Sequence, residues 1–189
     1  MSYLLHSKEV KYGILIDCGE FVTVREVINE LGITIKAVLL THGHSDHIMG
    51  LEELLKEYPN TEIYAHKEGH EELQDSRKNF SFYHGMPFSM INYSAVVVND
   101  GEIFKFEGLT DIEILYTPGH DSSCITYKAE RHLFTGDAYI PGIEVYTKLP
   151  RGNNEQALAS TVRLVAMEKG GFLIHCGHHS YNKNNYNIN

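Results

Sequence analysis

Three imidazoles and one carboxylate fall within six residues of the segment 39–54. The sequence there reads His42-x-His44-x-Asp46-His47, directly after the apolar run IKAVLLT. Neutral imidazole and carboxylate groups are ligands of zinc and of related divalent ions. This density of such groups behind a predicted buried strand favours a metal site over a loop of solvated polar side chains.

Other predicted strands also end in a residue that can bind a metal. The segments ILID, ILYTPGH, HLFTGD and FLIHCGH end at Asp17, His120, Asp137 and His178. Strand ends that meet at one edge of a sheet are where open α/β architectures build their sites. Glycines beside these residues, at 119, 136 and 177, permit tight turns and close backbone approach. We therefore expect the ligands to converge.

The set is large enough for two metal ions. Paired metals about 3.5–4 Å apart need several ligands each and a shared group between them, and they can activate a water near neutral pH. One site can be formed by His42, His44 and His120, the other by Asp46, His47 and His178, with a carboxylate such as Asp137 as the bridge.

Strands and helices alternate along the chain, which predicts mixed sheets with helices outside. Segments 2–7 and 12–19 predict a hairpin. A helix is expected to stop at Gly32 and another to end at Pro59. The segment AVVVNDGEIFKFEG predicts two strands joined by an Asn-Asp-Gly turn. A later helix is expected to begin at Asn153 or Asn154.

Composition narrows the class of protein. The 189 residues are 42% hydrophobic with a net charge of -9, which fits one domain over residues 1–189. No basic stripe, long apolar span or secretory leader is evident, so we expect no nucleic-acid partner, no membrane partner and a small-molecule substrate. The three cysteines lack CxxC spacing and predict a reduced, cytoplasmic protein.

The motifs THGHSDHIMG, YTPGHDSS, FTGDA and CGHH, in this order after LIDCG, resemble the metallo-β-lactamase superfamily, in particular its short glyoxalase II-like branch. The resemblance covers nearly the whole chain. It implies an α+β fold, the αβ/βα four-layer sandwich. Relatives usually carry one more N-terminal strand, so either the sheet edge is trimmed here or the start of the chain is mis-assigned. An edge trimmed in this way would need a cover, and a homodimer is one way to provide it.

The resemblance also assigns roles. It makes His42, His44 and His120 ligands of one metal, Asp46, His47 and His178 ligands of the other, and Asp137 the bridge. Asp17 would orient the HxHxDH loop from behind, and Asp46 would steer the proton to the leaving group. The expected cofactors are two divalent ions, with zinc first and iron or manganese as alternatives.

The function implied is a zinc-type hydrolase in which metal-bound hydroxide attacks a thioester or ester. Full-length glyoxalase II enzymes carry a further helical domain for glutathione, and this chain is expected to lack it. Alternatives are a mononuclear iron enzyme resembling persulfide dioxygenases, a lactonase, a lactam hydrolase, and a non-catalytic binding module. An RNA-processing role is disfavoured because the chain has no basic path for phosphates.

Several residues beyond the ligands attract attention. Tyr146, Lys148 and Arg151 could bind an anionic substrate group or could be solvated charges. His84 lies in an aromatic loop with Phe80, Phe82, Tyr83 and Phe88, which either walls the pocket or packs structurally. His66 and His70 lack the Glu placement of HExxH and predict a solvated helix face. His179 is expected to be a neighbour of the ligand His178 and not itself a ligand.

Overall fold

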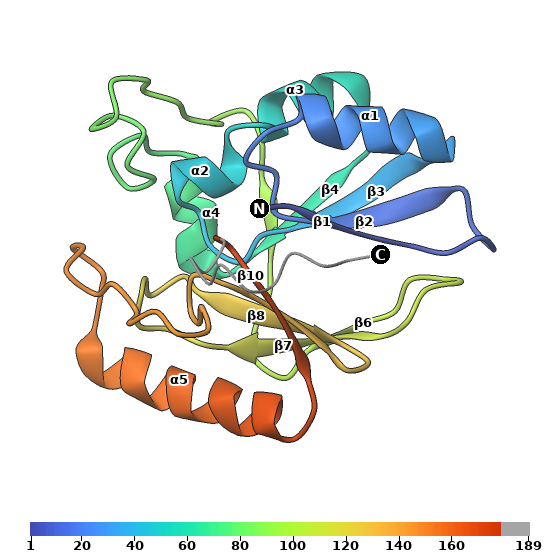
Figure 1. The fold of residues 1–189 in the computed structure, drawn as a ribbon. Helices are drawn as coiled ribbons and strands as arrows, with labels where there is room; N and C mark the ends of the chain where they lie inside the picture. The colour runs from blue at the N-terminus through green and yellow to red at the C-terminus, as the bar shows by residue number, and fades with distance from the viewer. Residues whose placement is uncertain (179–189) are drawn as a thin grey trace.

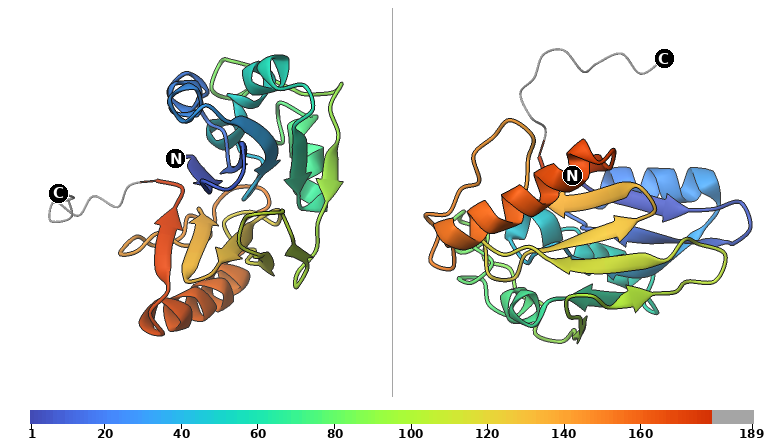
Figure 2. Two further views of the ribbon diagram at one scale, coloured as in Figure 1. Left: turned by 90° about the vertical axis from the view of Figure 1, so that its right-hand side faces the viewer. Right: turned by 90° about the horizontal axis from the view of Figure 1, so that it is seen from below.

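The computed structural model describes residues 1–178, and the neighbour His179 lies outside them. Two five-stranded sheets face each other, with helices on both outer sides (Figures 1 and 2). The first sheet contains β1 (Tyr3–His6), β2 (Tyr12–Ile16), β3 (Thr34–Leu39), β4 (Glu62–Ala65) and β5 (Ala95–Val97), in that spatial order. The second contains, in spatial order, β10 (Leu173–Cys176), β9 (His132–Gly136), β8 (Ile125–Ala129), β7 (Ile112–Tyr116) and β6 (Ile103–Phe104).

The helices complete the four layers. The first sheet is accompanied by α1 (Val22–Leu31), α2 (Ser45–Ile48), α3 (Leu51–Glu57) and α4 (Lys67–Leu73), and the second is covered by α5 (Asn154–Lys169). Gly32 ends α1 in the left-handed conformation, as predicted from the stop at this glycine. Asn153 is the N-cap of α5, because its side chain accepts a hydrogen bond from the backbone N–H of Gln156. The predicted αβ/βα sandwich is therefore confirmed.

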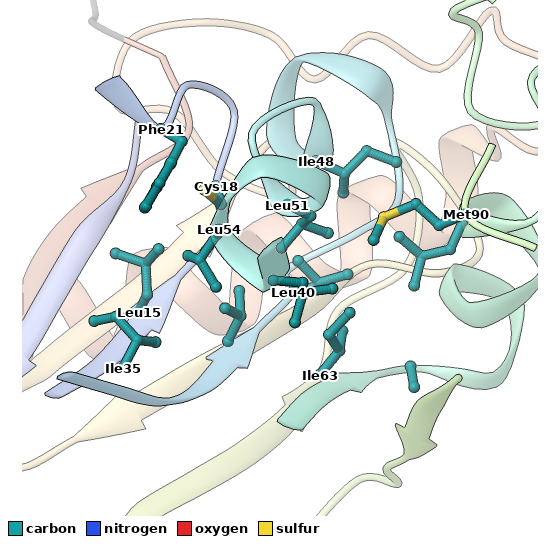
Figure 3. Close-up of a cluster of buried hydrophobic side chains, with 14 of the residues drawn as sticks. Leu15, Cys18, Phe21, Ile35, Leu40, Ile48, Leu51, Leu54, Ile63 and Met90 are labelled. Carbon is teal, nitrogen blue, oxygen red and sulfur yellow. The ribbon is translucent and has the colours of Figure 1, made fainter. Parts of the chain in front are cut away.

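Three apolar clusters hold the layers together. Alternation along β2 sends Leu15 toward the helices and Ile14 and Ile16 toward the second sheet. The helix-side cluster includes Leu40, Leu51 and other large side chains packed between α3 and the sheet (Figure 3). Because β3 buries side chains on both faces, its sequence reads as a continuous apolar run.

The two strands predicted around the Asn-Asp-Gly turn both exist, at 95–97 and 103–104. They do not pair with each other: β5 pairs parallel with β4, whereas β6 pairs antiparallel with β7. The turn after Asn99 therefore carries the chain from one sheet to the other. Its turn residues predict a reversal correctly, but the choice of pairing partner depends on burial against distant strands.

The N-terminal strand is the edge of the first sheet and pairs only with β2 among the strands described. Its start is tied to the end of β10. The Met1 amino group donates to the Gly177 carbonyl at 2.7 Å, and the Tyr3 hydroxyl donates to the Cys176 carbonyl at 2.6 Å. These bonds join the two sheets at the end of the sandwich where the predicted ligands lie. Within residues 1–178, no helix is long and apolar enough to span a bilayer.

Candidate metal centre

The predicted ligands converge at one end of the sandwich. The parallel strands β2, β3, β9 and β10 all end there, so the polar turns that follow them lie close together. Ligand atoms of His42, His44 and His120 lie within 4.8 Å of one another. So do those of Asp46, His47 and His178. The two groups expected from the sequence are therefore assembled by the fold.

Asp137 lies between the two groups. Its Oδ2 is 3.6 Å from Nε2 of His120 and 3.3 Å from Nε2 of His178. Its Oδ1 is 3.4 Å from Nε2 of His47. One carboxylate thus reaches ligands of both groups, which is the placement a bridging ligand requires.

The first group has each imidazole fixed from behind. His42 Nδ1 donates to Thr41 Oγ1 at 3.1 Å, and His120 Nδ1 donates to the Tyr146 carbonyl at 2.8 Å. His44 uses its other nitrogen: Nε2 faces Asp121 Oδ2 at 3.2 Å, while Nδ1 lies 3.2 Å from His120 Nε2. Each ring therefore has one nitrogen held by the protein and one directed at the centre.

Asp17 performs the same task for the second group and links it to the first. Its carboxylate accepts from His47 Nδ1, the Thr41 hydroxyl and the Thr41 backbone N–H, each at 2.7 Å. Asp17 also adopts a positive φ of 55°, a conformation that costs energy for a residue other than glycine. The strained turn is stabilised by these three hydrogen bonds, and it holds the HxHxDH loop in place.

The donor set fits divalent metal ions. Among the described residues, the buried Nε2 atoms of His42 and His47 and the buried Oδ1 of Asp137 have no hydrogen-bond partner. Buried polar atoms are normally satisfied, so three orphaned ligand atoms in one cluster indicate an ionic partner. Nitrogen and carboxylate donors suit zinc, iron or manganese.

The predicted ligands differ in the direction in which their surroundings shift the pKa. Burial raises the pKa of Asp46, but the His178 hydrogen bond and the His47 charge outweigh it and bring the pKa to about 2. Burial lowers the pKa of His47, yet the Asp17 and Asp137 carboxylates raise it to about 10. Hydrogen bonds to Asp137 and Asp46 raise the pKa of His178 to about 9. Burial and neighbouring imidazoles instead lower the pKa of His42.

Gly177 shows why small residues flank the ligands. A Cβ at this position would collide with the Asp137 carboxylate and lie 2.7 Å from Cε1 of His47. The turn after β10 can therefore pass behind the bridging carboxylate only without a side chain.

Arg151 does not face the centre as a free cation. Its guanidinium binds Glu72 and lies 3.1 Å from Asp121 Oδ2, and both carboxylates are fully buried. The charge of Arg151 is thus already paired within the protein, and its role toward an anionic substrate group stays a prediction. Tyr146 contributes its backbone carbonyl to His120, while its ring and the Lys148 side chain are exposed, so substrate roles for these two remain predictions.

Sequence reasoning missed three supporting residues. Thr41 and Asp121 directly flank the predicted ligands His42 and His120, and that adjacency is a usable signal. Glu72 has no such signal: it lies on α4 and reaches the site by accepting from the Gly43 backbone N–H at 2.7 Å. Its role appears only when α4 packs against the ligand loop.

His66 and His70 also differ from the solvated face predicted. The His66 ring stacks on Tyr116 with 4.9 Å between ring centroids, and His70 Nδ1 accepts from the Ala95 backbone N–H at 3.2 Å. Both are half-buried structural residues, and neither belongs to the ligand groups.

The chain belongs to the metallo-beta-lactamase superfamily, whose family model matches residues 1–184. A hydroxyacylglutathione hydrolase GloC from Haemophilus influenzae is 31% identical over 94% of this chain and 84% of its own length. A hydroxyacylglutathione hydrolase from Francisella tularensis subsp. novicida is 33% identical over 71% of this chain. The match covers 45% of that relative.

A structural comparison agrees with the family assignment. The crystal structure of the BLEG-1 B3 metallo-beta-lactamase superposes with a TM-score of 0.81 at 22% identity, covering 95% of this chain and 86% of that one. The similarity in structure establishes the fold.

Proposed function

We propose that this protein is a dinuclear, metal-dependent hydrolase of small acyl compounds, with a thioester as the first substrate class and zinc as the first metal. The observation that carries the proposal is the pair of three-ligand groups that share Asp137. The relatives named as hydroxyacylglutathione hydrolases support a thioester, since that is the bond such enzymes cleave.

His42, His44 and His120 would hold one ion, and Asp46, His47 and His178 the other, with Asp137 between them. Bound divalent ions supply Lewis acidity, which polarises a carbonyl and makes water acidic near neutral pH. The reaction adds water across the acyl–sulfur bond: a C–O bond forms, the C–S bond breaks, and one proton moves from water to the thiolate.

The protein's own groups prepare that proton transfer. The Asp46 side chain is 50% exposed, and its Oδ2 lies 3.1 Å from His178 Nε2. With a pKa of about 2 it stays ionised at neutral pH. It is therefore an acceptor that orients the attacking water and passes a proton toward the leaving atom.

A substrate panel tests the proposal. Protein loaded with zinc, iron or manganese should hydrolyse simple thioesters, and the Asp137→Ala variant should not. If lactones are cleaved and thioesters are not, the lactonase alternative replaces this one. If the protein instead holds a single iron and consumes oxygen with a persulfide, the dioxygenase alternative replaces it.

A further inference from the structure

The turn that carries His178 is held by Tyr3, a residue of the opposite sheet. Among the described strands, β10 is an edge strand and pairs only with β9. The Gly177 N–H donates to the Gly136 carbonyl of β9 at 2.8 Å, so the preceding Cys176 carbonyl is directed toward the free edge. There the Tyr3 hydroxyl donates to this carbonyl at 2.6 Å. Tyr3 thus binds the backbone two residues before a predicted metal ligand.

Tyr3 also lies beside the support of the other histidine in the second group. In the antiparallel pair of β1 and β2, Tyr3 is opposite Ile16. The next residue, Asp17, accepts a hydrogen bond from His47 Nδ1 at 2.7 Å. One side chain therefore spans the gap between the sheets at the place where they contribute His47 and His178 to the same ligand group.

The position of the Tyr3 ring is fixed by aromatic contacts on the second sheet. The ring meets Phe134 and His175 edge-on, with ring centroids 5.4 and 5.2 Å away, which is a favourable arrangement of such rings. His175 is held in turn, because its Nε2 lies 2.8 Å from Nδ1 of His132. The Tyr3 hydroxyl therefore has a defined position, and so does the carbonyl that it binds.

Farther along β1 the two sheets do not close on each other. A cavity of about 560 Å³ lies there, with Leu5 and His132 among its lining residues. At the metal end, where β1 and β10 lie on the same side of the sandwich (Figure 2), the Met1 amino group donates to the Gly177 carbonyl at 2.7 Å. The turn is thus held at two adjacent carbonyls, and Tyr3 is the side chain that binds one of them.

The His178 imidazole depends on the backbone of this turn for its position. Its side chain is 47% exposed, and its Nε2 lies 3.1 Å from Asp46 Oδ2 and 3.3 Å from Asp137 Oδ2. Both partners are predicted ligands of the same centre, so they do not fix the ring from outside it. The direction of the imidazole therefore follows from the backbone, and the backbone is held by its hydrogen bonds.

We propose that Tyr3 is a positioning residue for the second metal ion, because its hydroxyl holds the turn 176–178 where His178 and His47 can bind the same ion. Removing an outer hydrogen-bond partner of a ligand usually lowers metal affinity by about 10–100-fold. Tyr3 acts through the backbone and beside the Met1 bond, so we expect the lower end of this range. The inference rests on the proposed two-metal centre and adds a residue distant in sequence from the ligand motifs.

Zinc titration of metal-free, full-length protein in competition with a coloured chelator tests the proposal, because it gives two stepwise dissociation constants. Tyr3→Phe keeps the ring and removes only the hydroxyl. We expect the second Kd to rise about tenfold and the first to change by less than about twofold. A merely structural role would instead weaken the first ion at least as much, since metal binding would then have to offset unfolding.

Tyr12→Phe is the matched control. Tyr12 begins β2, at the end of the strand remote from Asp17, and its hydroxyl donates to the backbone carbonyl of Glu107. This variant removes the same kind of hydrogen bond and also keeps the ring. Both dissociation constants should stay at the values of the unmodified protein.

The outcomes separate this inference from the proposed centre beneath it. If Tyr3→Phe binds two ions with unchanged constants, the role of Tyr3 is overturned and the two-metal centre stands. Equal weakening of both ions in Tyr3→Phe, or weakening of the second ion by Tyr12→Phe to the same extent, would also overturn it. If the unmodified protein binds only one ion, the two-metal centre fails and the inference fails with it.

Discussion

The two ligand groups differ in how far solvent reaches them. His42, His44 and His120 are 1%, 6% and 7% exposed. In the second group only His47 is buried, whereas the side chains of Asp46 and His178 are 50% and 47% exposed. The buried group is thus enclosed within the protein, and the second group faces the entrance of the site.

The two groups also differ in the hydrogen-bond partners that hold their side chains in place. Every imidazole of the first group has a hydrogen-bond partner behind it, in Thr41, Asp121 and the Tyr146 carbonyl. In the second group His47 has Asp17, while the nitrogen of His178 near Asp46 and Asp137 is held by the ligands themselves. Preorganised ligands bind more tightly, so we expect the first ion to bind more strongly than the second.

Replacing the shared carboxylate should weaken metal binding at both groups together. We expect Asp137→Ala to lower occupancy at both positions and to reduce kcat/KM by more than about a thousandfold, because groups that act as a unit fail together. Metal content and turnover measured on the same sample check this. Full activity in this variant would rule out a bridged pair.

Removing the exposed ligand should separate the groups. In His178→Ala we expect about one tightly held metal per chain and activity lowered by on the order of a hundredfold, since the first group remains intact. Chelator titration followed by elemental analysis measures this. Simultaneous loss of both ions would show that the first group depends on the second.

Replacing each of the two supporting carboxylates should lower the affinity for a different ion. Asp121→Asn is expected to weaken the first ion by about 10–100-fold through His44, which is the usual effect of removing an outer hydrogen-bond partner of a ligand. Asp17→Asn should act mainly on the second ion through His47. Competition with a coloured chelator gives both affinities. Equal effects of each variant on both ions would contradict the assignment.

The two groups should also differ in how many protons they release when a metal binds. Near pH 7 the metal-free protein carries protons on His47 and His178, whose pKa values are about 10 and about 9, but not on His42, whose pKa is lowered. Filling the second group should therefore release more protons than filling the first. Calorimetry in buffers of different ionisation enthalpy measures this release. Greater proton release with the first, tighter ion would reverse the order of binding.

The same shifts set the stability of the metal-free protein. Groups whose pKa is raised on folding stabilise the native state below their unfolded value and lose that contribution as the pH rises through the folded value. We expect thermal unfolding of chelator-treated protein to occur at lower temperature as the pH rises from about 7 toward 10. A transition temperature that increases over this range would contradict the pairing of these histidines with carboxylates.

The smallest effect is expected at His66. Its ring stacks on Tyr116, and among the described residues it belongs to none of the ligand groups, so His66→Ala should cost at most about 1 kcal/mol of stability. Metal content and turnover should match those of the unmodified protein. A loss of metal in this variant would mean that α4 is coupled to the centre through more than Glu72.

Much of the centre could be predicted because residues at strand ends are marked by a local sequence pattern. Asp17, Asp137 and His178 each follow an apolar run and a turn, and the order of strands then brings them together. The role of Glu72 and the ion pairs of Arg151 have no such pattern in the sequence, since they depend on how α4 and the loop before α5 pack. The separation of β5 from β6 was hidden for the same reason: the turn is local, but the pairing is not.

Metal content is the most direct test of the central claim, which is that two ions share Asp137. The protein would be purified without added metal or chelator and analysed by elemental mass spectrometry. We expect about two divalent ions per chain, and fewer at both positions in Asp137→Ala. About one iron per chain with little else would contradict the paired centre and favour the oxygenase.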